Sequence, residues 1–461
     1  MRKAVNPRPA HTSAQTGAPL WWLHPVWFMT IPILAMSLAA YLIPEADFQE
    51  SWRTPKAFAI GDLALCTAVA GVFAIGCLIA SWMGSGFSRS QRLAPGPRDV
   101  HVGQEELKVL FNIAVIVTIT GYIIWFGSIL KTGGIGMFTT MLTGGKGSSD
   151  DLKRISADSM ITGVTTFTQF GMGTALLGVY LGFTQGWHKV RGQLALMVGV
   201  TVFRAVFLSE RLSLIELMLP SMVLWVRLIG FGRPGSALRR LLLVLPVIGV
   251  AGLYLLFTFT EYFRSWASFY SDHADQSLFE FSMLRLLGYY VTGLNNGAIE
   301  WHANGALHFP YAILDWLWRF PVFGENLQAA LGGDKDPALI RTVVLTAEGN
   351  PEFNNTTGIF IVFTDIGVAG ALGFFLLYGY VAGLLHDSYK RGSAAGMFLY
   401  PYLCIAMSEQ MLIMYITSGR AFPTWMLLLL AVLISAPGSR RNRTLRKPAA
   451  QSAPALTTSA P

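Results

Sequence analysis

The chain has 461 residues, of which 53% are hydrophobic and only 13% are charged. Soluble domains carry about a quarter charged residues, so this composition excludes a soluble enzyme and a disordered protein and predicts several membrane spans. The formal net charge of +8 alone would suit a nucleic-acid-binding protein, but the positions of the basic residues in the chain give it another explanation. Cys66, Cys77 and Cys404 all lie in apolar stretches, and they form no disulfide framework or cysteine-rich metal site.

Ten apolar segments are long enough, or nearly so, to cross a bilayer core of about 30 Å. The first follows Arg2, Lys3 and Arg8 and has no small-residue cleavage site, which predicts a retained anchor and not a signal peptide. The sequence therefore predicts an all-α polytopic membrane bundle of about ten transmembrane helices. In chain order the segments are 26–43, 57–83, 109–130, 160–184, 193–209, 212–230, 241–260, 358–385, 395–417 and 421–436.

Basic residues gather in alternate connections, which sets the orientation because cytoplasmic loops are enriched in Lys and Arg. Of the 34 Lys and Arg residues, 20 lie in segments 1–25, 84–108, 185–192, 226–240, 385–393 and 437–461. Both termini are therefore predicted to be cytoplasmic, and the basic tail needs no nucleic acid. The predicted parts are a cytoplasmic N-terminus at 1–25, helices one to seven within 26–260, a large outer loop at 261–357, helices eight to ten within 358–436, and a disordered cytoplasmic tail at 437–461.

Two long connections fall on the outer side, a Gly-rich one at 131–159 and the larger one at 261–357. Structureless loops beyond about 15 residues are uncommon, so the larger connection is predicted to be a small, partly helical folded layer. Within it, Leu278–Leu294 and Tyr311–Phe323 show helical spacing of apolar residues. The second stretch suits either a helix in the membrane interface or one that packs on the bundle.

Ionisable residues inside spans cost at least ~2.5 kcal/mol each at the bilayer centre and are candidates for function. In the predicted orientation these residues lie within roughly 12 Å of the outer surface, and the inner half of the bundle holds none. This predicts a polar site that opens outward, although a solvated or capped position is an equal alternative for Asp62 and Glu216. The five residues are Asp62, Arg204, Glu216, Asp365 and Glu409.

Arginines on the outer side oppose the positive-inside trend. Arg211 stands in the short turn between the fifth and sixth spans, with Arg204 two turns earlier, and Arg420 follows the ninth span. Arg264, Arg285 and Arg341 lie in the large loop. A guanidinium fork matches phosphate or pyrophosphate oxygens, whereas the alternative for any one loop arginine is a solvated surface charge.

Other catalytic and metal-binding motifs are absent from the sequence or incomplete. The stretch LTGGKGS departs from a phosphate-binding loop at Thr140 and Gly147, where the motif needs glycine and Ser or Thr. His302 and His308 have no third ligand nearby, and no G-x-S-x-G element occurs. The sequence therefore predicts neither a metal nor a cofactor.

Three elements together resemble a known family. They are Ser209-Glu210-Arg211-Leu212-Ser213, the Asn354 to Thr357 stretch that enters a span, and Asp365-Ile366-Gly367-Val368-Ala369-Gly370 within that span. With the large outer loop, over roughly residues 195–385, the chain resembles the Wzy-type oligosaccharide repeat-unit polymerases, within the wider O-antigen polymerase and ligase group. The related ligases usually place His where this chain has Asn, which favours a polymerase over a ligase.

The resemblance implies a glycosyltransferase of the bacterial inner membrane that acts on undecaprenyl-pyrophosphate-linked glycans at the outer face and makes O-antigen or exopolysaccharide. Arg211 and Arg204, with Arg264, Arg285 and Arg341, would then surround the pyrophosphate without a metal. Arg420, Asn354 and Asn355 are further candidates for substrate binding. Glu261, Asp315, Glu325 and Asp365 are candidate general bases, although Asp365 could instead hold an arginine in place.

Two alternatives stay open at the level of sequence. The first is an O-antigen ligase, which would transfer the finished glycan to another acceptor. The second is a transporter or flippase of polyprenyl-linked or polar substrates, which should show paired halves and charges near the midplane. No internal repeat is visible. For the polymerase, a chain-length regulator and a flippase of the same pathway are expected partners.

Overall fold

The structure is a computed structural model that describes residues 20–87, 104–142 and 148–435, with gaps at 162, 209, 232–234, 268, 274–275, 321, 334–335 and 351. All regular secondary structure in these residues is helical, and no strand occurs among them. This confirms the all-α prediction. The first 19 residues, the predicted tail at 437–461 and Ser209 of the S-x-R element lie outside the described residues.

Six helices are long and apolar enough to cross a membrane, judged by length and composition. They are α1 (Pro25–Leu42), α3 (Ile60–Phe87), α4 (Gln104–Lys131), α9 (Leu212–Ile229), α10 (Ala237–Glu261) and α15 (Gly358–Arg391). Four other predicted segments coincide with helices of only 15, 17, 16 and 14 residues, namely α7 (Gly171–Gln185), α8 (Arg191–Phe207), α16 (Ala394–Glu409) and α17 (Phe422–Ser435). The count of ten spans therefore stays a prediction.

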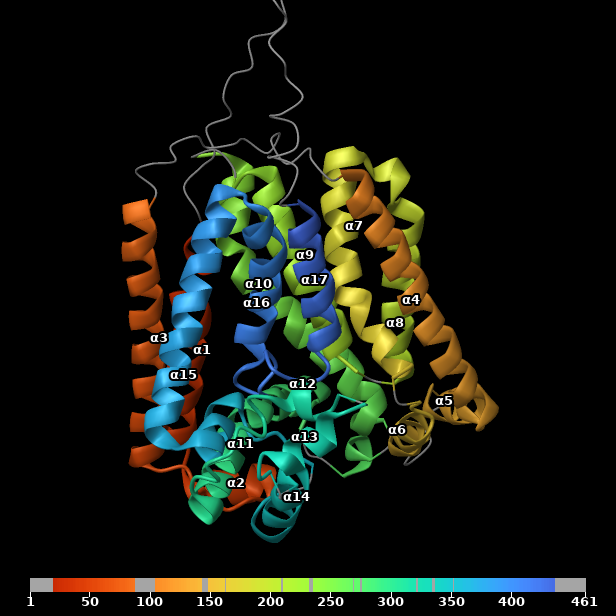
Figure 1. Cartoon of the computed structure of the whole chain (residues 1–461). Coiled ribbons are helices and arrows are strands. Elements are labelled where there is room, and N and C mark those ends of the chain that lie inside the picture. The colour runs from red at the N-terminus through yellow and green to blue at the C-terminus, as the bar shows by residue number, and fades with distance from the viewer. Residues whose placement is uncertain are drawn as a thin grey trace, which may run out of the picture.

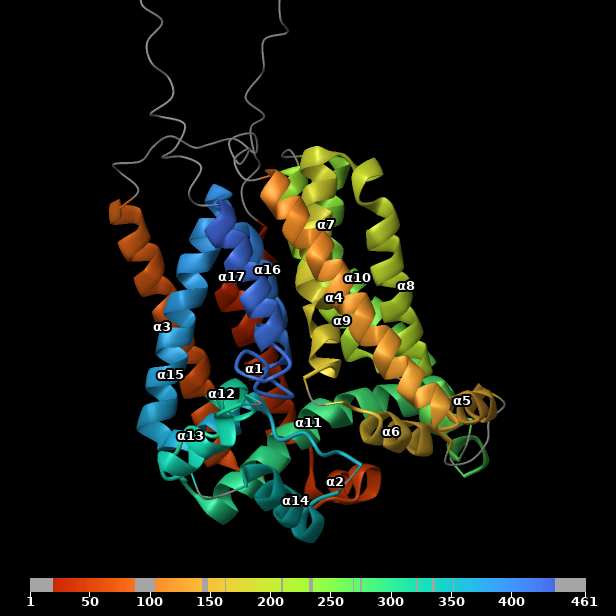
Figure 2. The same cartoon turned by 45° about the vertical axis from the view of Figure 1, so that its right-hand side comes forward.

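The remaining helices gather at one end of the long ones (Figures 1 and 2). We call this group the end layer. Its members are α2 (Glu45–Trp52), α5 (Gly134–Leu142), α6 (Ser148–Asp158), α11 (Leu278–Asn304), α12 (Asp315–Trp318), α13 (Gly324–Ala330) and α14 (Pro337–Glu348). Short 3-10 or π turns occur at Trp21–Leu23, Thr165–Phe170, Trp187–Lys189, Tyr262–Trp266 and Tyr270–Asp272.

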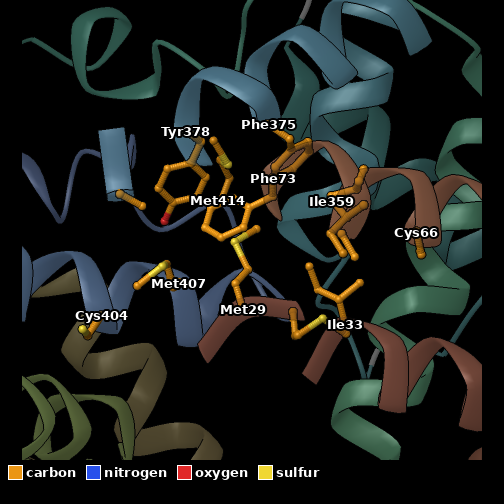
Figure 3. Packing of buried hydrophobic residues seen from close by; sticks show 14 of the residues in the cluster. Met29, Ile33, Cys66, Phe73, Ile359, Phe375, Tyr378, Cys404, Met407 and Met414 are labelled. Atoms are coloured by element: carbon orange, nitrogen blue, oxygen red, sulfur yellow. The ribbon is translucent and has the colours of Figure 1, made fainter. Parts of the chain in front are cut away.

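Helices α1, α3 and α15 pack together around the largest hydrophobic cluster. A Cβ atom added at Gly379 would lie 2.1 Å from the carbonyl oxygen of Phe73, so the α3 and α15 backbones meet there directly. Small residues allow such close approach between membrane helices. Beside the glycine contact, the rings of Phe73 and Tyr378 meet edge to face with centroids 5.5 Å apart (Figure 3).

The long helices differ in how much protein surrounds them. Half of the most apolar stretch of α15 is buried inside the protein, whereas only 17% of the corresponding stretch of α10 is buried. Helix α10 contacts mainly α11 near its end and the turn that follows it. Most of its side therefore faces outward, away from other helices.

Helix α15 is broken at Gly367, whose φ of 72° and ψ of 177° suit only glycine. The break frees backbone carbonyls, and the connection after α11 satisfies them: Leu307 N donates to Thr364 O (2.7 Å), and Phe309 N donates to Asp365 O (3.0 Å). Asp365 also accepts hydrogen bonds through Oδ2 from Ala312 N (2.7 Å) and Ile313 N (3.0 Å). The break therefore ties α15 to the end layer.

Gly367→Ala is expected to lower the free energy of unfolding by about 1 to 3 kcal/mol, because alanine would be strained at this φ and ψ. A Cβ there would meet only Ala306 Cβ, at an ordinary 3.5 Å, so backbone strain and not a clash is the cause. Gly373→Ala is the matched control, since its Cβ would meet nothing within 4 Å in the same helix. Unfolding titrations in detergent compare the two variants, and equal midpoints would contradict the prediction.

Two predicted segments are longer than the helices that the structure shows there. Tyr311–Phe323 is not a single helix, because only Asp315–Trp318 is helical. Trp318 folds back, its Nε1 donating to Pro310 O (3.0 Å), and Pro321 follows, which disfavours helical backbone at the residue before it. The ninth predicted span, 395–417, is also too long, because α16 ends at Glu409 and irregular turns follow up to α17.

The five candidates of the sequence analysis leave out a buried ionisable residue at the end of α9. Arg227, in the last turn of α9, is 7% exposed. Its Nε donates to Tyr389 O (2.8 Å) and its Nη2 to Lys390 O (3.2 Å), so it binds the carbonyls in the last turn of α15. A cation stabilises a helix C-terminus in this way, which gives Arg227 a structural role.

Candidate functional site

Glu261, the last residue of α10, is fully buried and contacts three arginines. Its Oε1 lies 3.1 Å from Arg211 Nη1 and 3.6 Å from Arg264 Nη1, and its Oε2 lies 3.0 Å from Arg285 Nε. Ser265 Oγ donates to Oε2 as well (2.8 Å). We call Arg211, Arg264, Arg285 and Glu261 the arginine cluster.

Four separate elements place these side chains. Arg211 is the residue before α9, and Glu261 ends α10. The π-helical turn Tyr262–Trp266 follows directly and carries Arg264, as π turns often do at functional sites. Arg285 lies on α11, which begins at a capping box formed by Ser277 and Glu280.

The arginine cluster carries excess positive charge. Among the described residues, one further acid contacts it: Glu352, whose Oε2 lies 3.2 Å from Arg285 Nη1 and whose side chain is half exposed. Three guanidinium groups thus face two carboxylates. Burial alone would lower the pKa of Arg285, but Glu261, Tyr289 and Glu352 raise it above its usual range, so the group stays charged.

Aromatic rings contact all three guanidinium groups, and that of Arg285 lies 5.4 Å from the centre of the Phe353 ring. The Arg211 guanidinium carbon lies 3.9 Å from the centre of the Phe257 ring and 4.9 Å from that of Tyr289. Arg264 Nη1 donates to the Tyr289 hydroxyl (2.6 Å). Stacking and ion pairing together fix the planar fork of Arg211, as recognition of a phosphate group requires.

A second group of charged residues lies next to the arginine cluster, because Glu210 belongs to this group and directly precedes Arg211 in the chain. Arg204 donates to Glu210 Oε2 through Nε (3.0 Å) and Nη2 (2.7 Å). Arg420 donates to both oxygens of Glu216, through Nε (2.7 Å) and Nη2 (2.9 Å). We call Arg204 and Arg420 the paired arginines, and their acids are Glu210 and Glu216. Arg204, Glu216 and Arg420 line a small polar cavity together with Tyr122, Thr201 and Tyr415.

A solvated or capped position was an alternative for both Asp62 and Glu216, and the structure distinguishes the two residues. Glu216 is 7% exposed, and Tyr415 also donates to its Oε1 (2.7 Å), so it is a buried, paired acid. Asp62 accepts a hydrogen bond from Ala59 N at the start of α3 (2.8 Å), and its Oδ1 lies 3.0 Å from His302 Nε2. The capping alternative therefore holds for Asp62.

The other predicted site residues lie outside the arginine cluster. Arg341 pairs with Glu300 (3.2 Å), and both lie within electrostatic range of Asp365. Asp315 accepts from Arg319 Nε (2.6 Å) and from Gly419 N (2.8 Å), which ties α12 to the turn that carries Arg420.

Asn354 is exposed and Asn355 half-buried, in the stretch that leads into α15. Asn296 Nδ2 donates to the backbone oxygen of Asn355 (3.1 Å). Glu325 is exposed at the start of α13, and among the described residues no ion pair joins it to an arginine. The structure thus brings neither the asparagines nor Glu325 into the arginine cluster.

The geometry separates the candidate bases. Glu261, Asp315 and Asp365 have their carboxylates engaged by arginines or backbone N–H groups, an arrangement that favours positioning over proton transfer. Their catalytic role stays a prediction. Sequence reasoning missed Glu352, Tyr289 and Tyr415; of these, Tyr289 had a local signal, since it lies four residues after Arg285 on the same helical face.

Comparison of this chain with protein-family models, with curated proteins and with solved structures gave no match. The resemblance to the repeat-unit polymerases therefore rests on the quoted motifs alone. In the part of the chain that the structure describes, no group of three His, Cys, Asp or Glu residues is arranged to hold a metal ion.

Proposed function

We propose that this protein is a membrane glycosyltransferase that polymerises undecaprenyl-pyrophosphate-linked oligosaccharide repeat units at the outer face of the bacterial inner membrane. The observation that carries the proposal is the convergence of Arg211, Arg264 and Arg285 on one buried carboxylate. Such a cluster matches the diphosphate of a lipid-linked donor, which carries several negative charges in a compact group.

The proposal includes a topology of ten spans with both termini cytoplasmic and the end layer outside. Its support is the distribution of charge along the helices. Arg239 and Arg240 begin α10, whereas Glu261 ends it, so the basic connection and the arginine cluster lie at opposite ends of one apolar helix. The positive-inside rule then places the arginine cluster on the outer side.

In the proposed reaction an acceptor sugar hydroxyl attacks the anomeric carbon of the growing chain. The new C–O bond forms as the bond to the diphosphate oxygen breaks, and the lipid diphosphate leaves with the electron pair. Preorganised arginines stabilise the negative charge that develops on this oxygen. Glu261 keeps the three guanidinium groups in place, and the half-exposed Glu352 is the acid that a diphosphate can displace from Arg285.

The break in α15 is the feature that bears on the transporter alternative, because transporters use discontinuous helices to bind substrates. Here the carbonyls of Thr364 and Asp365 accept hydrogen bonds from Leu307 N and Phe309 N. They are not free to hold an ion or a substrate. The break therefore gives the transporter no specific support.

Reconstitution tests the proposal. Purified protein in liposomes, supplied only with a lipid-linked repeat unit, is expected to yield a ladder of longer lipid-linked chains and free polyprenyl diphosphate. Transfer of preformed chains to a second acceptor without elongation would favour the ligase instead. In cells that lack the protein, single repeat units should remain on the lipid carrier, and long chains on the carrier would contradict the polymerase.

A further inference from the structure

Glu409 is a buried acid whose carboxylate has no partner among the described residues. It is the last residue of α16, and its side chain is 7% exposed. Among the described residues, neither a hydrogen bond nor an ion pair engages its carboxylate, in contrast to Glu216, Glu261, Asp315 and Asp365. Buried acids are almost always paired, so this exception needs an explanation.

Three effects make this position unfavourable for a negative charge. Burial removes most of the side chain from water. The C-terminal end of a helix carries partial negative charge, which repels a carboxylate at that end. Glu216, a second acid, lies within electrostatic range. The opposing attraction comes from Arg211 and Arg420, and each of these already pairs with another acid.

The surroundings of Glu409 connect the two groups of arginines. Arg211 belongs to the arginine cluster, and Arg420 to the paired arginines, so Glu409 lies in the field of both. Tyr290 of α11 is also within electrostatic range. Helix α16 packs against α9, which begins just after Arg211. Glu409, whose carboxylate no described residue engages, thus lies within electrostatic range of Arg211, where the donor diphosphate is proposed to bind.

We propose that Glu409 is the catalytic residue that accepts the proton of the acceptor hydroxyl; this inference rests on the proposed function. As the hydroxyl oxygen bonds to the anomeric carbon, its proton passes to the Glu409 carboxylate. The bond between that carbon and the diphosphate oxygen breaks, and the electron pair leaves with the lipid diphosphate. An unpaired carboxylate suits this role because no arginine or N–H group occupies the oxygen that must take the proton.

Glu409→Gln keeps the shape of the side chain and removes its basicity. In liposomes with the lipid-linked repeat unit, the variant is expected to elongate chains at least about 100-fold more slowly than the wild type, as loss of a general base does. The KM for the donor should stay unchanged, because the arginines that bind it are intact. Its unfolding midpoint should equal or exceed that of the wild type, since an unpaired buried charge is removed. Glu409→Asp should keep part of the rate.

Glu50→Gln, at an exposed position on α2, is the matched control and should elongate at the wild-type rate. Full activity of Glu409→Gln beside an active wild type would overturn the inference and leave the proposed function standing. A less stable variant with a raised KM would show that Glu409 holds the arginines in place, which also overturns it. An inactive wild type would refute the proposed function itself, and the inference with it.

Discussion

Glu261→Gln is expected to lower the free energy of unfolding by about 3 to 5 kcal/mol, the usual cost of removing one partner from a buried ion pair. The side chain of Glu261 has no exposed surface, and its single negative charge offsets part of the positive charge of three guanidinium groups. Glutamine has nearly the same volume but no charge. Arg211, Arg264 and Arg285 would then repel one another with only the half-exposed Glu352 in contact to compensate, and α9, α10 and α11 would lose their common anchor.

Unfolding by SDS in mixed micelles measures this effect. Glu352→Gln is the matched control, because it removes a second acid from the same arginines but at a half-exposed position. Exposed ion pairs contribute about 0 to 1 kcal/mol, so the control should unfold near the wild-type midpoint. Equal losses in the two variants would show that Glu261 is not the anchor that its burial indicates.

Arg211→Ala is expected to slow chain elongation by about 100- to 1,000-fold, as removal of one charge-stabilising group from an active site does. Its guanidinium is fixed between Glu261 and the rings of Phe257 and Tyr289 and is 16% exposed, so a ligand can reach it. Arg211→Lys should recover only part of the rate, because an ammonium group lacks the planar fork. Stability should fall less than in Glu261→Gln, since Glu261 retains two arginines.

The measurement is the length distribution of lipid-linked glycans made in liposomes. Arg154→Ala is the control, because Arg154 is an exposed arginine of α6 in the same end layer. Wild-type chain lengths in both Arg211→Ala and Arg211→Lys would place the diphosphate elsewhere. A loss in Arg154→Ala as large as that in Arg211→Ala would show a general effect of surface charge instead of a site.

The positions of the helices could be predicted because hydrophobic runs are local. Each of the ten apolar segments coincides with a helix, although four of these are shorter than a typical span. The end of α16 at Glu409 was missed because the apolar residues continue to Tyr415 and Ile416 after the helix stops. The helix ends because of a tertiary contact: Gln410 O accepts hydrogen bonds from Gly358 N and from Thr357 Oγ1, which is 53 residues away in the chain.

The arginines of the candidate site could be predicted because arginine in a short turn that is predicted to lie outside opposes the expected charge distribution. Their partners could not, except for Glu261 and Arg264, which are three residues apart on one turn. Arg211 meets Glu261 across 50 residues, and Arg420 meets Glu216 across 204. Such pairings depend on how α9, α10 and α16 pack, which the spacing of charges along the chain does not encode.

The small buried fraction of α10 makes its neighbours mostly lipid, if it spans the membrane as proposed. A helix with few protein contacts adjusts its tilt to the thickness of the bilayer, whereas the glycine-packed α3 and α15 are held by each other. A change in tilt would move Glu261 at the end of α10 relative to Arg211 and Arg285, which other elements carry. The bilayer would then act as a component of the site, and acyl-chain length would control the rate of the proposed reaction.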